Sequence, residues 1–257
     1  MKKRFDANAF LRFFPSAGQR RRPGAAPLAM HIAALCSAGG FAGCDNAAIA
    51  DRKRKISMLL DSFESQLVLV DYQERLMPAI FEGAAVLANA RLLAQVAQQL
   101  EVPVWGTEQN PSKLGANDAQ LRALCHKTLA KMQFSAVEEG LGEWLRPPAR
   151  PQGGNARSLP KHLQKPQTQE AERGTIVLAG CEAHVCLLQT ALDLVEEEFD
   201  VWVVTDACSS RTERNRDAAF DRLAGAGVEL VTTEMVVFEW LGSCEHPAFK
   251  DVLALIK

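Results

Sequence analysis

The sequence predicts a three-layer, Rossmann-like α/β fold, in which a mostly parallel six-stranded sheet is flanked by helices. Three observations lead to this prediction. Short runs rich in β-branched residues alternate with longer segments whose apolar residues follow a helical period. The short runs are continuously apolar, which is typical of strands buried on both faces. With 257 residues, of which 47% are hydrophobic, the chain is long enough to bury a large core without disulfides.

Six runs are predicted to be strands because each is short, apolar and followed by polar or turn-forming residues. In chain order they are residues 67–70 (LVLV), 102–105 (VPVW), 127–131 (KTLAK), 175–180 (TIVLAG), 201–205 (VWVVT) and 228–232 (VELVT). The run at 127–131 has the weakest pattern, since a lysine stands at each of its ends.

Four segments between these runs are predicted to be amphipathic helices, because their apolar residues recur at helical spacing and their outer faces are charged. They are residues 84–100, a region around 138–145, 184–197 and 213–226. Gly225 and Gly227 stand where the last of these helices would end before the final strand. The alternation of strand and helix predicts parallel strands joined by right-handed crossovers.

The chain divides into an N-terminal extension and one domain. Residues 1–57 are rich in Arg, Ala and Gly without a sustained period, which predicts a disordered extension or a translated segment upstream of a start at Met58. A transit peptide, a basic arm and a secretory signal are alternative interpretations of this stretch. Residues 58–257 form the predicted domain, with the Pro- and Gln-rich residues 147–169 as an inserted surface loop.

Charge and cysteine content narrow the possible partners and the compartment. Residues 1–55 carry eleven Lys or Arg and three Asp or Glu, whereas residues 56–257 carry eighteen and twenty-eight. An acidic domain argues against nucleic acid as a partner. The apolar stretch at 25–43 is interrupted by His31 and several glycines, so it predicts no membrane span. Seven cysteines without a Cys-x-x-Cys pair indicate a reduced, cytoplasmic protein.

Residues that follow the predicted strands are the candidates for chemistry, because ligands of such sheets bind beyond the carboxyl ends of the strands. Those with polar or nucleophilic side chains are Asp71, Gln73, Thr107, Glu108, Gln109, Lys131, the run at 180–186 and the run at 206–211. The sequence has no Gly-x-x-x-x-Gly-Lys-Ser/Thr, no Gly-x-Gly-x-x-Gly after its first strand and no Gly-x-Ser-x-Gly. These absences argue against nucleotide, NAD and serine-hydrolase chemistry, and we expect no cofactor.

Cys186 is the most informative of the candidates, because it falls in the first turn of a predicted helix. The amides and the dipole of such a turn favour a thiolate and can bind an oxyanion. The alternative is a small buried apolar residue, which suits Cys125, Cys181 and Cys208 better. Likewise, an Asp at position 71 can cap a turn. A lysine at position 131 can simply be solvated. His184 lies two residues before Cys186 and would therefore point to a different face of the helix.

Five segments together resemble the isochorismatase-like cysteine hydrolases, the superfamily that includes nicotinamidases and N-carbamoylsarcosine amidohydrolase. They are LVLVDYQERLMP (67–78), VPVWGTEQNP (102–111), KTLAKMQFSA (127–136), VLAGCEAHVCLLQTALDL (177–194) and VVTDACSSR (203–211). Their order is the order expected of the family, and the resemblance covers residues 58–257. The sequence is similar in particular to the small isochorismatase-domain hydrolases.

The resemblance implies a catalytic triad in which Cys186 is the nucleophile, Asp71 accepts its proton and Lys131 holds the pair. It also implies a non-proline cis peptide between Cys181 and Glu182. The oxyanion hole would then be formed by the amide of Glu182 or Ala183 together with that of Cys186. The reaction implied is hydrolysis of a small amide-type C–N bond through a thioester at the cysteine. A non-amide substrate is also open, since isochorismatase itself cleaves a vinyl ether.

One departure from the nicotinamidases concerns the metal. They carry an Asp-x-His metal motif after the second strand, whereas residues 106–111 read GTEQNP here. We therefore expect no metal and a substrate other than nicotinamide. The substrate pocket is predicted to include Gln73, Glu108, Gln109 and Arg211. Arg211 can anchor a substrate carboxylate, join an interface or form a structural ion pair.

Two further functions are carried as alternatives to the hydrolase. One is a low-activity ligand-binding or scaffold protein with the same fold. The other is a thiol redox sensor that pairs Cys186 with Cys181 or Cys208, which requires their sulfurs to approach within disulfide range. We expect a small-molecule substrate and a homo-oligomer. The apolar C-terminal segments MVVFEWL (235–241) and FKDVLALIK (249–257) supply contact surface for such an assembly.

Overall fold

The computed structural model of the chain describes residues 58–146 and 173–256. The predictions for residues 1–57 and for the loop at 147–169 lie outside the described residues. The described part forms one six-stranded sheet with the order β3-β2-β1-β4-β5-β6, and each pair of neighbouring strands is parallel. The strands are β1 (Ser65–Val70), β2 (Val104–Gln109), β3 (Lys127–Lys131), β4 (Thr175–Cys181), β5 (Asp200–Ser209) and β6 (Glu229–Val231). The predicted fold class and all six predicted strands are confirmed.

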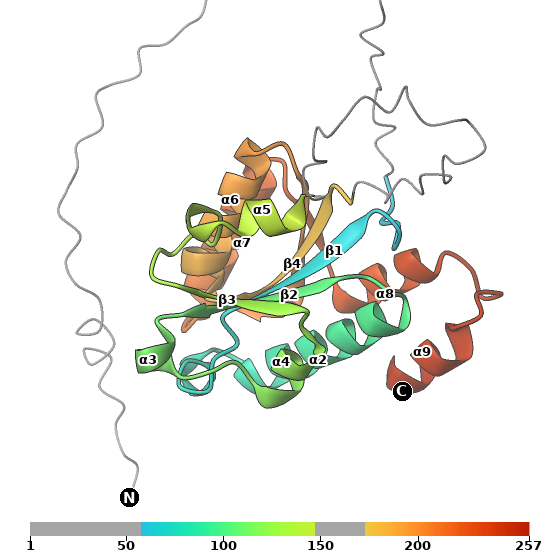
Figure 1. Ribbon diagram of the computed structural model, residues 1–257, viewed down its shortest axis with the longest axis horizontal. Coiled ribbons are helices and arrows are strands. Elements are labelled where there is room, and N and C mark those ends of the chain that lie inside the picture. The colour runs from blue at the N-terminus through green and yellow to red at the C-terminus, as the bar shows by residue number, and fades with distance from the viewer. Residues whose placement is uncertain (1–57, 147–172, 257) are drawn as a thin grey trace, which may run out of the picture. The chain divides into compact units, whose positions relative to one another are not determined.

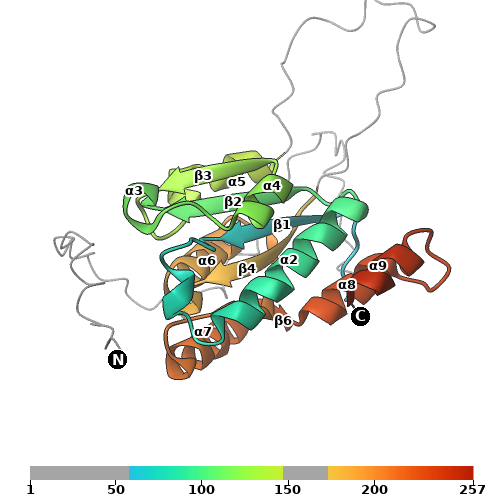
Figure 2. The same cartoon turned by 90° about the horizontal axis from the view of Figure 1, so that it is seen from below.

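Helices cover both faces of the sheet, and Figures 1 and 2 show the two layers. One layer contains α2 (Gly83–Gln99), α4 (Ala119–Leu124), α8 (Thr233–Leu241) and α9 (Phe249–Ile256). The other contains α5 (Leu141–Leu145), α6 (Leu188–Glu196) and α7 (Glu213–Gly225). The short helix α3 (Pro111–Leu114) follows β2. This three-layer arrangement leaves the carboxyl ends of the strands as the common edge at which side chains from different strands can meet.

Three of the differences from the predicted boundaries bear on the candidate site. Strand β2 runs on to Gln109 and β5 to Ser209, so Thr107–Gln109 and Asp206–Ser209 lie within strands rather than in turns after them. Most of these side chains are polar, which hides the strands from a pattern search, yet the backbones of Thr107–Gln109 pair with β3 and those of Cys208 and Ser209 pair with β4. The predicted helix at 184–197 begins with a single π-helical turn, η5 (Ala183–Leu187), before α6.

The segment at 235–241 belongs mainly to the core rather than to a contact surface, because it forms most of α8. Val236 and Val237 are fully buried in this helix. The indole nitrogen of Trp240 donates to the Ser65 hydroxyl at 3.0 Å and thereby ties α8 to the start of β1. Only Met235 and Phe238 of this segment remain substantially exposed, at 45% and 43%. The contact surface that this segment can offer is therefore limited to these two side chains.

A glycine brings the ends of β1 and β4 into close contact. Gly180 has a φ of +155°, and a Cβ at this position would lie 2.3 Å from the carbonyl oxygen of Val70. Only a residue without a side chain fits such an approach. The residues that follow, Asp71 after β1 and Cys181 at the end of β4, are therefore both held at the same place on the sheet edge.

Candidate active site

Asp71 is the first residue after β1, and its carboxylate is fully buried. Its backbone has a φ of +54°, a left-handed conformation that turns the chain sharply at the end of the strand. One carboxylate oxygen, Oδ1, accepts a hydrogen bond from the Thr107 hydroxyl at 2.7 Å. The other, Oδ2, forms an ion pair with the Lys131 ammonium at 2.9 Å. Both oxygens are thus fixed in position by side chains of β2 and β3.

Lys131 ends β3, and its side chain is buried together with that of Asp71. Besides Asp71, its ammonium donates to Gln109 Oε1 at 2.7 Å and to the Phe134 carbonyl at 3.1 Å, with a longer contact of 3.4 Å to the Gln133 carbonyl. An ammonium has three N–H donors, so the three shorter contacts use all of them. A buried charge is tolerated only when it is paired and hydrogen-bonded in this way.

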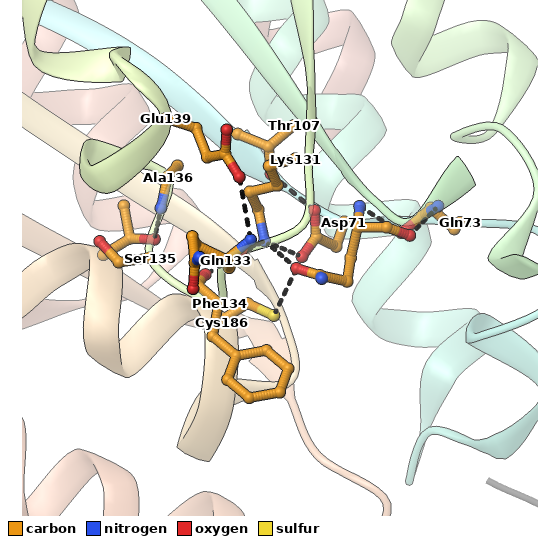
Figure 3. A network of polar contacts seen from close by, with 12 residues as sticks. Asp71, Gln73, Thr107, Lys131, Gln133, Phe134, Ser135, Ala136, Glu139 and Cys186 are labelled. Carbon is orange, nitrogen blue, oxygen red and sulfur yellow. Dashed lines mark hydrogen bonds and ion pairs between the residues drawn. The ribbon is translucent and has the colours of Figure 1, made fainter. Parts of the chain in front are cut away.

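Cys186 lies in the π-helical turn η5, and only 6% of it is exposed. Its sulfur is 3.8 Å from Gln109 Oε1, the same oxygen that accepts from Lys131. Figure 3 shows Cys186, Lys131 and Asp71 as members of one network of polar contacts. The nucleophile, carboxylate and amine that the resemblance implied are therefore brought together by η5, β1 and β3.

The electrostatic environment of the thiol differs from the one expected at a helix N-terminus. Burial raises the pKa of the Cys186 thiol well above its ordinary value, and the Asp71 carboxylate raises it further, while Lys131 lowers it. Desolvation of the buried sulfur outweighs the nearby ammonium. Burial therefore favours the neutral thiol at Cys186, whereas its helical position predicted a stabilised thiolate.

The turn before Cys186 contains the predicted oxyanion residues. The peptide bond between Cys181 and Glu182 is cis. The Glu182 carbonyl accepts from the amides of Val185 and Leu187 at 3.0 and 3.3 Å, and the Cys186 amide is not part of this pair of bonds. Ala183 follows as the first residue of η5 and is fully buried.

Arg211 forms an ion pair within the protein. Its Nε and its backbone N–H donate to Glu182 Oε2 at 2.8 and 3.1 Å. The Glu182 side chain is only 4% exposed, whereas that of Arg211 is 31% exposed. Of the three roles considered for Arg211, the structure contains the ion pair. This pair ties the end of β5 to the turn that leads to Cys186.

Two glutamines of the predicted pocket interlock. Gln73 Oε1 accepts from the Gln109 backbone N–H at 2.9 Å, and Gln73 Nε2 donates to the Gln109 carbonyl at 3.0 Å. The Gln73 side chain therefore fixes the backbone of Gln109. Of the two glutamines, Gln109 is the one whose side chain contacts Lys131 and Cys186.

Glu108 is not brought to this cluster. Its carboxylate accepts a hydrogen bond from the backbone N–H of Asn117 at 2.9 Å. Successive side chains of a strand point to opposite faces, so Glu108 faces away from the side on which Thr107 and Gln109 contact Asp71 and Lys131. The prediction that Glu108 lines the pocket is therefore not supported by its position.

Other residues of the predicted crevice have structural partners. Asp206 accepts from the backbone N–H and the hydroxyl of Thr233 at the start of α8, both at 2.8 Å. His184 Nδ1 lies 2.9 Å from the Ser210 hydroxyl, and its Nε2 lies 3.4 Å from the Asn215 side-chain nitrogen. The pKa of His184 is lowered, chiefly by burial. Sequence reasoning missed the Phe134 carbonyl that binds Lys131, because a backbone acceptor leaves no signal in residue types.

The five cysteines within the described residues are all free: Cys125, Cys181, Cys186, Cys208 and Cys244. Burial raises the pKa of Cys125 to about 11 and that of Cys181 to about 12. In residues 58–146 and 173–256, no group of three or more His, Cys, Asp or Glu side chains could hold a metal ion. Nor does this part of the chain contain a helix long and apolar enough to cross a membrane.

Comparisons with known proteins show which family the chain resembles. Residues 158–235 match the isochorismatase domain family. The chain is 35% identical over 192 residues to isochorismatase domain-containing protein 2 of Xenopus laevis, which covers 75% of this chain and 83% of that protein. A similar match, 35% over 194 residues, is found with isochorismatase domain-containing protein 2B of Mus musculus, covering 75% of this chain and 81% of that protein.

Solved structures resemble the fold over most of its length. The MAR1 ribonuclease of Caenorhabditis elegans has a TM-score of 0.65 and 29% identity, covering 77% of this chain and 92% of that one. The YcaC gene product of Escherichia coli, described as an octameric hydrolase of unknown specificity, has a TM-score of 0.62 and 22% identity, covering 78% of this chain and 97% of that one. At that identity, the second comparison shows a common fold alone.

Proposed function

The chain belongs to the isochorismatase domain family, and from this premise we propose that it is a metal-independent cysteine hydrolase of a small amide-type C–N bonded substrate. The observation that carries the proposal is the convergence of Cys186, Asp71 and Lys131 in one buried cluster. A thiol, a carboxylate and an amine in contact are the groups required for attack, proton transfer and charge balance. A decayed site would be expected to have lost at least one of the three.

The first step is attack of the Cys186 sulfur on the substrate carbonyl. Because burial favours the neutral thiol, a general base fits this site better than a preformed thiolate. Asp71 accepts the S–H proton as the C–S bond forms, and the carbonyl becomes a tetrahedral oxyanion. In this proposal the amide of Glu182 or Ala183 and that of Cys186 donate to this oxygen.

The second half of the reaction returns the proton and releases the products. Protonated Asp71 gives its proton to the leaving nitrogen, the C–N bond breaks and a thioester remains on Cys186. Water then attacks the thioester while Asp71 takes its proton, and breakdown of this second tetrahedral adduct restores the thiol and releases the acid. Lys131 remains an ammonium throughout and holds the carboxylate in place.

The residues at the end of β2 support metal independence. Where nicotinamidases have a histidine-containing metal motif, this chain has Thr107, Glu108 and Gln109. Thr107 and Gln109 are hydrogen-bonded to Asp71 and Lys131, respectively. The Glu108 carboxylate accepts from the backbone N–H of Asn117. We also propose a homo-oligomer, on the ground that α8 and α9 expose Met235, Phe238 and Leu255. Sedimentation equilibrium would determine its state.

The proposal is tested with the full chain and a panel of small amides and ureas, with released ammonia or amine as the readout. We expect turnover of at least one compound and a loss of about 10³-fold or more in Cys186→Ala. Mass spectrometry of the reacting enzyme should show an acyl adduct on Cys186. Arg91→Met, which breaks a partly exposed ion pair with Asp118 between α2 and α4, is the matched control and should retain activity.

RNA is included in the panel because the name of the C. elegans neighbour includes ribonuclease. Hydrolysis that persists in Cys186→Ala would refute the cysteine mechanism. Cleavage of RNA alone would refute the substrate class.

A further inference from the structure

The Gln109 side chain contacts both Lys131 and Cys186 and belongs to neither end of the proposed proton transfer. Its Oε1 accepts from the Lys131 ammonium at 2.7 Å and lies 3.8 Å from the Cys186 sulfur. It is 3% exposed, so both contacts are shielded from water. A carboxamide oxygen in this position acts on the charge of the sulfur, because it is the negative end of a dipole.

The orientation of this carboxamide is fixed by its other contacts. Its Nε2 donates to the Met132 carbonyl at 2.8 Å, and its backbone is held on both sides by the Gln73 side chain. A flip of the amide would place an N–H against the Lys131 ammonium and the oxygen against a carbonyl, so both contacts would become repulsive. Oε1 must therefore face the lysine and the thiol.

The carboxamide oxygen and the sulfur compete for the same ammonium. Asp71, Gln109 and the Phe134 carbonyl are the three nearest acceptors of the Lys131 ammonium, so a thiolate at Cys186 would have to compete with them for its three N–H groups. At the same time, Oε1 offers an acceptor to the S–H proton of Cys186. Both effects favour the thiol: the first withholds a charge-assisted donor from the thiolate and the second stabilises the protonated form.

We propose that Gln109 is a positioning residue that keeps Cys186 protonated in the resting site, by holding an N–H of Lys131 away from the sulfur and presenting its own carbonyl oxygen to the S–H. The inference deepens the proposed function and rests on Cys186 as its nucleophile. A thiol held in this way resists alkylation and oxidation until a substrate carbonyl arrives and Asp71 removes the proton. Gln109 would thus restrict the reactivity of the sulfur to the substrate complex.

The test is the rate of iodoacetamide alkylation of Cys186 as a function of pH, read by peptide mass spectrometry on the folded full-length chain. Gln109→Met has a similar volume but no carbonyl, so it frees a lysine N–H for the sulfur. We expect alkylation at neutral pH to be about tenfold faster, with the profile displaced by about one pH unit to lower pH. Gln109→Glu keeps the shape and adds a negative charge, and should displace the profile to higher pH.

Gln120→Met, the same substitution at an exposed residue of α4, should leave the profile as in the wild type. An unchanged profile in Gln109→Met, or displacement of both Gln109 variants in the same direction, would overturn the inference. The buried Cys181 and Cys208 serve as an internal gauge of opening. If these two cysteines become reactive in Gln109→Met, the substitution has opened the fold, and Gln109→Glu is then the variant that tests the inference. An alkylation profile of Gln109→Glu that does not move to higher pH would overturn it.

This measurement needs no substrate, so its outcome is separable from that of the hydrolysis panel. Opposite displacements in the two variants without any hydrolysis would support the inference and count against the proposed function. Hydrolysis that depends on Cys186, with unchanged alkylation profiles in both Gln109 variants, would support the proposed function and count against the inference.

Discussion

Replacing Lys131 by Met tests whether the charges of the candidate site are buried as a pair. Met is unbranched and of similar length, so it fills most of the space that the lysine stem occupies. The substitution removes the ammonium that lies 2.9 Å from Asp71 and leaves a carboxylate whose side chain is 0% exposed. Thr107 is then its remaining side-chain donor. The variant therefore isolates the energetic consequence of a buried, unpaired charge.

The expected magnitude follows from this burial. Removing one partner of a buried ion pair costs about 3 to 5 kcal/mol, because the remaining charge loses its compensation. The free energy of unfolding of a typical domain is about 5 to 15 kcal/mol, so the loss is a large fraction of the total. Asp71→Asn combined with Lys131→Met removes both charges. We expect the double variant to recover about 2 kcal/mol relative to the sum of the single variants.

Urea unfolding of the four proteins measures these free energies, provided that the slope with denaturant is the same in each. Arg91→Met serves as the control, since Arg91 and Asp118 are 34% and 19% exposed and such pairs contribute about 1 kcal/mol or less. A loss below about 1 kcal/mol in Lys131→Met would refute the reasoning. Strict additivity in the double variant would refute it as well, because it would mean that the two charges do not interact.

Two further predictions concern the sheet edge and alkaline pH. Gly180→Ala should lower the free energy of unfolding by about 2 to 5 kcal/mol in the same urea assay, because its Cβ would meet Val70. Gly225→Ala is the control, since no atom lies near its Cβ, and should change that free energy by about 1 kcal/mol or less. Equal effects of the two substitutions would contradict the close contact at Gly180. Burial raises the pKa of Cys125 to about 11 and of Cys181 to about 12, so the folded state keeps protons that the unfolded chain loses. The contribution of these thiols to the free energy of unfolding is then fully present below about pH 9 and is lost as the pH rises towards about 12. A urea midpoint that stays constant over this range would be inconsistent with buried thiols.

The sheet could be predicted from the sequence because its strands carry a strong signal. Strands such as Leu67–Val70 are buried on both faces, and a short, continuous apolar run between turn-forming residues is typical of such strands. The ends of β2 and β5 could not be predicted in the same way. Thr107–Gln109 and most of Asp206–Ser209 are polar, and Thr107–Gln109, Cys208 and Ser209 pair through their backbones with neighbours that the sequence does not identify.

The candidate site was predictable in its members but not in its connections. Asp71 follows β1 and Lys131 ends β3, two strands away across β2, a separation of about 10 Å between backbones. Only the long stem of lysine can span this distance, and it passes Thr107 and Gln109 on the strand between. Which of these side chains face the lysine depends on the register of β2, and residue types alone do not fix that register.

The charge balance of the site bears on the kind of substrate that the proposed reaction can accept. With Asp71 ionised, Lys131 charged and Cys186 as a thiol, the buried cluster has no net charge. Attack on a neutral carbonyl moves the thiol proton to Asp71 and places the negative charge on the oxyanion, so the net charge stays at zero. An anionic substrate would add an uncompensated charge to a buried site, and the guanidinium of Arg211, the predicted anchor for a carboxylate, is already paired with Glu182. A neutral amide or urea therefore fits the proposed chemistry better than a carboxylate-bearing one.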